Sequence, residues 1–259
     1  EIEEIVFDKG AGGYRLETRV RNSMTKEETL AVCKILLESR ALVKGEMFPI
    51  IHKMVGALSD EKDRRFLKTM LDNEMHHYIE LKHGKNLLEL IWKLEYATKN
   101  QYFIKILYEK QNRTETVERI VKPVGIMFSE FYFYMTAFIE NIDKEKEFEN
   151  PNDIYPTIYR VDHIKQVLIQ EEHFSVPYIG RFEEGEFRKR IQFMYGGKLK
   201  NVIFQYTGGA IENILDRLPT ARILKKEGEC YTIRAEVFGK GIEFWMASQQ
   251  DNITGVKYI

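Results

Sequence analysis

The sequence Phe131-Tyr132-Phe133-Tyr134-Met135-Thr136-Ala137-Phe138 is typical of a β-strand, and Tyr159-Arg160-Val161-Asp162-His163-Ile164 follows it later in the chain. Successive side chains of a strand point to opposite faces. We therefore expect Tyr132, Tyr134 and Thr136 on one face, and Phe133, Met135 and Ala137 on the other. One face then belongs to a core, and the other is available as a ligand-binding surface.

The second phrase adds charge to this surface. Alternation places Arg160 and Asp162 on one strand face, where the guanidinium is expected to meet a phosphate or carboxylate beside the tyrosine hydroxyls. No obvious catalyst accompanies these groups, so the pattern favours a sensor domain over an enzyme. His76 and His77 do not predict a metal site, because adjacent helical side chains point about 100° apart. The sequence predicts neither a metal nor another cofactor.

Composition sets the broad class of the protein. The chain has 259 residues, of which 44% are hydrophobic and 31% charged, with a formal net charge of -1, so it is expected to fold. It can hold two or three small domains. Cys33 and Cys230 match no disulfide framework or metal spacing, which favours a reducing, cytoplasmic compartment. No apolar run predicts a membrane span, and no signal peptide pattern is present.

The first hundred residues are expected to be mostly helical after an N-terminal hairpin. Residues 1–16 predict two strands around the glycine-rich turn at 10–13. Thr25 and Glu28 form a capping-box pattern that begins a helix extending to about residue 42. Helical spacing predicts further helices at 48–58, 59–77 and 86–97. Because the chain starts with Glu inside a strand-like phrase, we expect it to be a fragment that has lost its beginning.

Strands are expected after residue 100, so the fold class is α+β with several domains. The five short strands at 102–108, 114–121, 131–139, 155–160 and 164–171 predict a small, strongly bent β-barrel that closes its edges. Beyond residue 198 the expected order is β-α-β-β-α-β, with strands at 199–206, 221–226, 230–238 and 253–259 and helices at 210–217 and 239–249. This order resembles a ferredoxin-like split unit.

These phrases resemble those of a known family. Phe133-Tyr134-Met135 resembles the Trp-Tyr-Leu signature of the WYL domain, and 159–164 resembles the Tyr-Arg-Leu-Asp-Arg-Ile phrase of that family. Residues 119–123, Arg-Ile-Val-Lys-Pro, are similar to its basic segment before a proline. Residues 198–259 resemble the extension that usually follows the domain, and 12–16 resemble the end of the wing in its winged helix-turn-helix.

The resemblance implies a ligand-responsive bacterial transcriptional regulator that is not an enzyme. It implies a wing remnant at 1–22, a helical linker that forms a homodimer at 23–98, an Sm-like five-stranded WYL β-barrel at 99–176, and a C-terminal extension at 177–259. The barrel of such proteins binds an effector, with nucleotides or single-stranded nucleic acid the leading candidates. DNA binding then belongs to the missing N-terminal domain.

The ligand-binding residues expected in this chain are Arg119, Lys122, Tyr132, Tyr134, Arg160 and His163. Tyr132 and Tyr134 are expected to stack on bases, while the cations hold phosphate. Two features differ from the family: Phe133 lacks an indole N–H, and His163 replaces an arginine with a group whose charge changes between pH 5 and 8. Residues 101–175 contain nine basic and thirteen acidic residues, which favours a small anion or a short single strand over a long nucleic acid.

Other interpretations remain open at this level. The aromatic residues can simply fill the barrel, and the cations can pair with Asp162 and Glu118. The densest basic cluster, Arg188-Lys189-Arg190, can extend a nucleic-acid surface or be ordinary solvated charge. The alternative functions are a nucleotide-acting hydrolase or nuclease with a scattered acid/base set, and a structural dimerisation module without a ligand.

Overall fold

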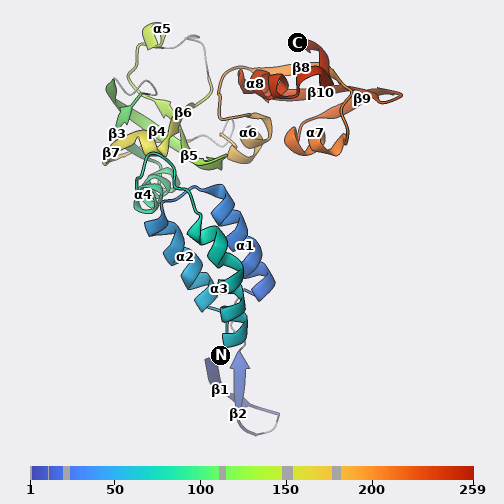
Figure 1. Cartoon of the computed structure of the whole chain (residues 1–259). Helices are drawn as coiled ribbons and strands as arrows, with labels where there is room; N and C mark the ends of the chain where they lie inside the picture. The colour runs from blue at the N-terminus through green and yellow to red at the C-terminus, as the bar shows by residue number, and fades with distance from the viewer. Residues whose placement is uncertain (1, 11, 20–23, 111–114, 148–153, 177–181) are drawn as a thin grey trace. The chain divides into compact units, whose positions relative to one another are not determined.

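The computed structural model describes residues 2–10, 12–19, 24–110, 115–147, 154–176 and 182–259. The chain divides into two compact units, residues 1–86 and 87–259 (Figure 1). It is an α+β protein in which antiparallel sheets lie in both units. None of the helices in the described part of the chain is long and apolar enough to cross a bilayer.

The first unit begins with the predicted hairpin. Strands β1 (Ile2–Asp8) and β2 (Gly13–Arg19) pair antiparallel, so that Phe7 lies opposite Tyr14. Their rings meet edge to face with centroids 5.1 Å apart. Gly12 has a φ of 65°, which glycine adopts at little cost, and this explains the glycine-rich turn.

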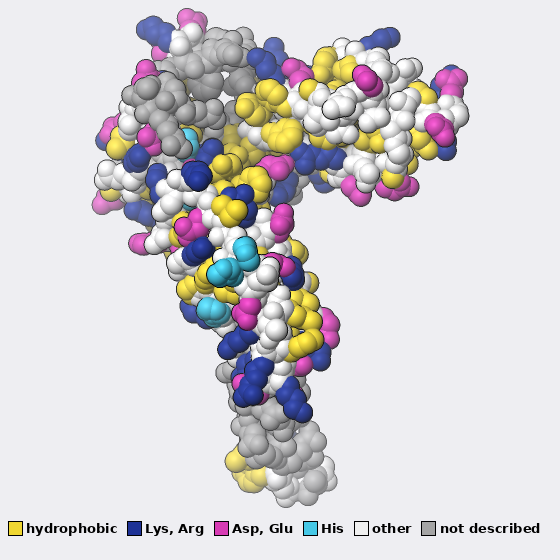
Figure 2. Space-filling model, in the orientation of Figure 1, with side chains coloured by type: hydrophobic (Ala, Val, Ile, Leu, Met, Phe, Trp, Pro, Cys, Tyr) yellow, Lys and Arg dark blue, Asp and Glu magenta, His cyan; other side chains and the backbone are white. Residues whose placement is uncertain are grey.

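Three helices follow in the same unit: α1 (Lys26–Ser39), α2 (Lys44–Gly56) and α3 (Glu61–His76). The predicted capping box is confirmed, because the Glu28 N–H donates to Thr25 Oγ1 and the Thr25 N–H donates to the Glu28 carboxylate. The helices bury one another's apolar faces, including Cys33, Met47 and Leu71. Basic and acidic side chains interleave over the visible surface of this bundle (Figure 2).

The second unit starts with α4 (Leu88–Lys99) and a five-stranded antiparallel sheet of order β6-β5-β4-β3-β7. Its strands are β3 (Tyr102–Glu109), β4 (Thr116–Ser129), β5 (Tyr132–Ile139), β6 (Thr157–Arg160) and β7 (Ile164–His173). A short helix, α5 (Lys144–Glu147), lies between β5 and β6.

The prediction of a closed barrel was wrong. Among the described residues no ladder joins the two edge strands β6 and β7, although only three residues separate them in the chain. The residues between them form a 3-10 turn, η1 (Val161–His163), whose Val161 C=O accepts from the Ile164 N–H. The chain bends at this point instead of continuing as paired strand, so the sheet keeps two edges.

An irregularity in β4 shapes this sheet. The register with β5 shifts between Pro123 and Gly125, because one extra residue of β4 bulges out. Proline has no N–H for the ladder, so a bulge accommodates it. A Cβ at Gly125 would lie 3.1 Å from Thr136 Oγ1 and 3.2 Å from a carboxylate oxygen of Glu184, so glycine leaves the space that these groups occupy.

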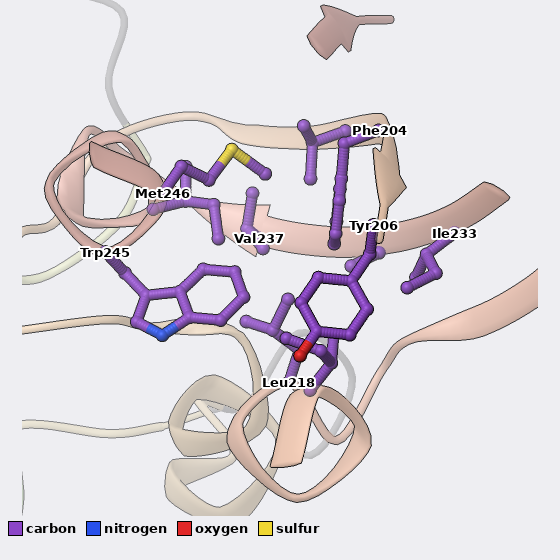
Figure 3. Close-up of a cluster of buried hydrophobic side chains, with 11 residues drawn as sticks. Phe204, Tyr206, Leu218, Ile233, Val237, Trp245 and Met246 are labelled. Atoms are coloured by element: carbon purple, nitrogen blue, oxygen red, sulfur yellow. The ribbon is translucent and has the colours of Figure 1, made fainter. Parts of the chain in front are cut away.

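The C-terminal part of this unit is a four-stranded antiparallel sheet of order β11-β8-β10-β9. Its elements are, in chain order, β8 (Leu199–Tyr206), α7 (Glu212–Arg217), β9 (Arg222–Glu227), β10 (Cys230–Phe238), α8 (Gly241–Ser248), η2 (Gln250–Asn252) and β11 (Ile253–Tyr258). Phe204 and Tyr206 of β8 pack with Trp245 and Met246 of α8 and with Leu218, which follows α7 (Figure 3).

Helix α6 (Glu184–Arg190) connects the two sheets of the second unit. Its Phe187 and the following Ile191 are buried together with Met127 of β4 and Phe238 of β10. An isolated bridge between Ile191 and Phe238 adds a backbone contact. One apolar cluster therefore receives side chains from both sheets, and α6 covers one end of the face of β4 and β5 that carries Tyr134.

Candidate functional site

Strand pairing places Tyr134 beside Arg160. Tyr134 of β5 lies opposite Arg160 of β6 and opposite Met127 of β4. Directly opposite residues of antiparallel strands point to the same face, with Cβ atoms about 5 Å apart. Tyr132 is two positions before Tyr134 and shares its face. The predicted alternation of β5 thus brings three of the expected ligand-binding residues together.

The Arg160 guanidinium lies over the Tyr132 ring. Its Cζ is 3.6 Å from the ring centroid, which is close stacking of a planar cation on a π face. The Tyr132 and Tyr134 rings meet edge to face, with centroids 6.4 Å apart and planes at 83°. This contact orients both rings at the same end of β5.

Asp162 holds the Arg160 guanidinium in place. Arg160 Nε donates to Asp162 Oδ1 at 3.1 Å, and Nη2 donates to Oδ2 at 2.7 Å. The Asp162 side chain is 1% exposed and that of Arg160 22%. Burial lowers the pKa of Arg160, but the hydrogen bonds and negative charge of Asp162 outweigh it and keep this pKa raised. The guanidinium is therefore a fixed, permanently charged group whose carboxylate partner balances its charge.

The expectation that Arg160 and Asp162 share a strand face was wrong. Arg160 ends β6, whereas Asp162 lies in η1, where side chains no longer alternate. The turn folds the carboxylate back onto the guanidinium two residues earlier. Pairing with Asp162, the alternative that the sequence left open, is what the structure contains.

Tyr134 contributes a neutral hydroxyl. Burial raises its pKa to about 12, although the nearby positive charge of Arg160 opposes this shift. The phenol is therefore protonated at neutral pH and is able to donate a hydrogen bond. Its ring packs against the apolar cluster that α6 forms with the two sheets. Tyr134 is thus one of the residues through which this face of the sheet contacts the C-terminal part of the unit.

His163 lies behind the ion pair and is buried. Its Nδ1 is 3.0 Å from the Glu109 backbone oxygen, and its Nε2 is 3.7 Å from Asp162 Oδ2. Tyr108, which the sequence did not single out, also supports the turn, because its hydroxyl accepts from the Arg160 N–H at 3.4 Å. Only its position in an aromatic, β-branched run signalled that Tyr108 is part of the sheet.

The other two expected residues lie elsewhere on β4. Arg119 is opposite Ile106 of β3, on the face away from Tyr134, and its Nη1 donates to the Glu118 backbone oxygen. Lys122 shares the face of Tyr134 but lies opposite Phe138, four residues further along β5. Its Nζ is 2.7 Å from a Glu140 carboxylate oxygen. The structure therefore gathers Tyr132, Tyr134 and Arg160, with His163 beneath them.

This cluster is equipped for binding. Two of the five guanidinium N–H groups are used by Asp162, and the described residues provide no recorded partner for Nη1. A flat cation, an aromatic ring and a phenol hydroxyl can together stack on a planar group and donate to an anion. Within the described ranges, no group of three or more His, Cys, Asp or Glu side chains is arranged to hold a metal ion.

Comparisons with known proteins relate part of the chain to a family model. No curated protein matched the chain. Among solved structures, proteasome accessory factor B/C (PafBC) of Arthrobacter aurescens aligns with 12% sequence identity and a TM-score of 0.35, over 97% of this chain and 35% of that chain. The chain thus spans about a third of the length of that protein. Residues 89–169 match the family model of the WYL domain, and this segment covers most of α4 and of the five-stranded sheet, including the cluster around Arg160.

Proposed function

We propose that the chain is the sensor part of a transcriptional regulator, in which the WYL segment binds an anionic effector through Tyr132, Tyr134 and Arg160. One observation carries the proposal: the Arg160 guanidinium lies 3.6 Å from the Tyr132 ring centroid, while the buried Asp162 holds it along one edge through Nε and Nη2. A guanidinium fixed in this way loses little entropy when it binds a ligand. The match of residues 89–169 to the WYL domain supports the proposal.

The local charges favour a small effector over a long nucleic acid. Asp162 already balances Arg160, and Glu140 balances Lys122. Polyanion binding depends on an excess of cations over carboxylates, because the extra cations neutralise phosphates. This cluster has no such excess. A nucleotide or a very short single strand needs only one stacking surface and a few N–H donors. His163 and Asp162 then position the turn and do not contact the ligand.

In this proposal each part of the chain has a role in regulation. Residues 1–22 belong to the wing of a winged helix-turn-helix domain, 23–98 form a homodimer, 99–176 are an Sm-like effector domain, and 177–259 are a ferredoxin-like extension. The last assignment is supported by the strand order β11-β8-β10-β9 with helices after β8 and β10. Regulation requires that the effector bind two dimer arrangements with different affinities, because equal affinity shifts no equilibrium.

The binding site is tested by titrating the whole chain with mononucleotides and short single-stranded oligonucleotides. Arg160→Lys keeps the charge but loses the planar stack, and Tyr132→Ala removes the stacking ring. Each is expected to weaken binding about tenfold, as loss of one stacked base or one bidentate contact does. The matched control is Lys105→Ala, which removes a cation paired with Glu118 elsewhere in the sheet. Saturable binding that responds equally to all three changes would contradict the assigned site.

A second candidate is a structural module without an effector, and the ion pair with Asp162 favours it. In this candidate, the pairing of Arg160 with a carboxylate that is 1% exposed has a purely structural role, which is to fix the turn. Absence of binding across the whole panel would support this candidate. Formation of a product during the titration would instead indicate an enzyme acting on nucleotides. The homodimer is checked separately by the mass of the chain in solution, and a monomer at micromolar concentration would exclude it.

A further inference from the structure

A cavity distinct from the Arg160 cluster lies between the end of β5, helix α6 and strand β10. Its volume is about 550 Å³, which is within the range of small-molecule pockets. Aromatic rings contribute much of its wall: Phe138, Tyr155, Phe182, Phe187 and Phe238. Four of these rings meet in series, Tyr155 with Phe238, Phe238 with Phe187 and Phe187 with Phe182, at centroid distances of 4.7 to 5.2 Å, so they form a continuous stretch of aromatic wall. We call this cavity the aromatic pocket.

The charged groups of the aromatic pocket are mainly carboxylates. Glu183, Glu186 and Glu236 line it together with one cation, Arg190. Arg190 donates to Glu236 at 2.6 Å and to Glu186 at 2.8 Å, so two carboxylates share its positive charge. The pKa of Glu186 is lowered by its hydrogen bonds to Arg190 and Lys189, which keeps this group ionised at neutral pH.

The pocket therefore has an excess of negative charge. Lys189 pairs with Glu186 without lining the cavity, and even with Lys189 counted the carboxylates outnumber the cations by three to two. Glu183 has no recorded ion pair among the described residues, and it is exposed. The carboxylates repel an anion that enters the pocket. They attract a cation, which also interacts favourably with the aromatic rings.

We propose that the aromatic pocket binds an organic ammonium cation with an apolar body. The rings remove the apolar body from water, and the carboxylates balance the ammonium charge. Because Phe138 and Tyr155 lie on the side of the five-stranded sheet while Phe238 belongs to β10, an occupant contacts both sheets at once. The charge preference is opposite to that of the Arg160 cluster, so the two sites take different ligands, and this proposal stands whether or not an anionic effector binds.

The proposal is tested first by varying the charge of the probe. The whole chain is titrated with phenyltrimethylammonium, with tert-butylbenzene as its neutral isostere, and with benzenesulfonate as an anion of similar size. Calorimetry and saturation-transfer NMR measure binding. The ammonium is expected to bind saturably and about tenfold more tightly than the neutral isostere. A cation–π contact with the rings and the attraction of the carboxylates together account for a difference of this size. Benzenesulfonate is expected not to bind. No saturable ammonium binding, or equal binding of the neutral isostere, would overturn the proposal.

Two variants then locate the site, because they are expected to act in opposite directions. Glu183→Gln removes an exposed carboxylate and weakens ammonium binding severalfold. Arg190→Gln frees Glu186 and Glu236 from their cation and is expected to strengthen ammonium binding severalfold. Glu229→Gln, at an exposed position between β9 and β10, is the matched control and is expected to change nothing. A structural effect alone weakens binding in both variants, so a loss in Arg190→Gln or no change in Glu183→Gln would show that the pocket is not the site.

Discussion

Replacing Arg160 by methionine is expected to destabilise the second unit strongly. Removal of one partner from a buried ion pair costs about 3–5 kcal/mol, because the remaining charge then stays buried without its main counter-charge. Asp162 is 1% exposed and cannot reach water, whereas the 22% exposure of Arg160 places the loss at the lower end of that range, about 3 kcal/mol. The lost stacking on Tyr132 adds about 1 kcal/mol. The sum, about 4 kcal/mol, is a large part of the 5–15 kcal/mol that stabilises a typical domain.

Urea denaturation followed by tryptophan fluorescence measures this effect. The two tryptophans of the chain, Trp92 and Trp245, both belong to the second unit, so the signal reports on the unit that contains Arg160. Lys225→Met is the matched control, because Lys225 pairs with Glu227 at 2.7 Å while their side chains are 63% and 67% exposed. An exposed pair contributes at most about 1 kcal/mol, so this variant is expected to unfold nearly as the parent does.

Asp162→Asn completes a double-mutant cycle. Alone it is expected to cost about 2 kcal/mol, less than Arg160→Met, because the remaining guanidinium can reach water. Combined with Arg160→Met it is expected to recover about 2 kcal/mol relative to the sum of the single changes, since the buried charge is then gone. Strictly additive losses, or a loss in Arg160→Met no larger than in the lysine control, would refute the idea that this ion pair organises the turn.

Three further outcomes are expected. Gly239→Ala destabilises the second unit by several kcal/mol, because φ is 61° and the new Cβ lies 2.1 Å from a backbone oxygen. Gly228→Ala, with φ of 59° and open space around the new Cβ, costs only about 1 kcal/mol. Urea denaturation of the two variants measures the difference. Burial raises the pKa of Cys33, which is 0% exposed, so a thiol reagent labels Cys230 first and Cys33 only on unfolding; simultaneous labelling would contradict this. Burial raises the pKa of Tyr134 to about 12, above the unfolded value near 10. The stability that the neutral phenol contributes is therefore complete below about pH 10 and is lost as the pH rises toward 12. Ultraviolet difference titration against Tyr134→Phe checks this, and ionisation near pH 10 would contradict it.

Local patterns in the sequence predicted most of the secondary structure. The alternation of β5 placed Tyr132 and Tyr134 on one face, and the register with β4, in which they lie opposite Ser129 and Met127, confirms this arrangement. Thr25 and Glu28 predicted the start of α1, and the glycine-rich turn predicted the first hairpin. These signals succeed because alternation, capping and turn geometry depend only on residues within a few positions of one another.

The candidate site depended more on distant neighbours. Alternation alone put Asp162 on a strand face, but a 3-10 turn carries it into a bidentate contact with Arg160. The sequence also grouped Arg119 and Lys122 with the tyrosines, whereas strand register separates Arg119 onto the opposite face and Glu140 pairs with Lys122. Which cation meets which carboxylate follows from contacts between strands, and these have no signal of fixed spacing along the chain.

The sequence by itself determined the α+β class, the two faces of β5 and the resemblance of residues 131–138 and 159–164 to the WYL domain. Only the tertiary structure decided that the sheet stays open between β6 and β7, that Arg160 is held by a buried Asp162, and that residues from both sheets and from α6 together line the aromatic pocket. The physical reason is the range of the interactions. Side-chain alternation is a property of each strand alone, whereas closure, ion pairing and cavities arise where segments far apart in the chain meet.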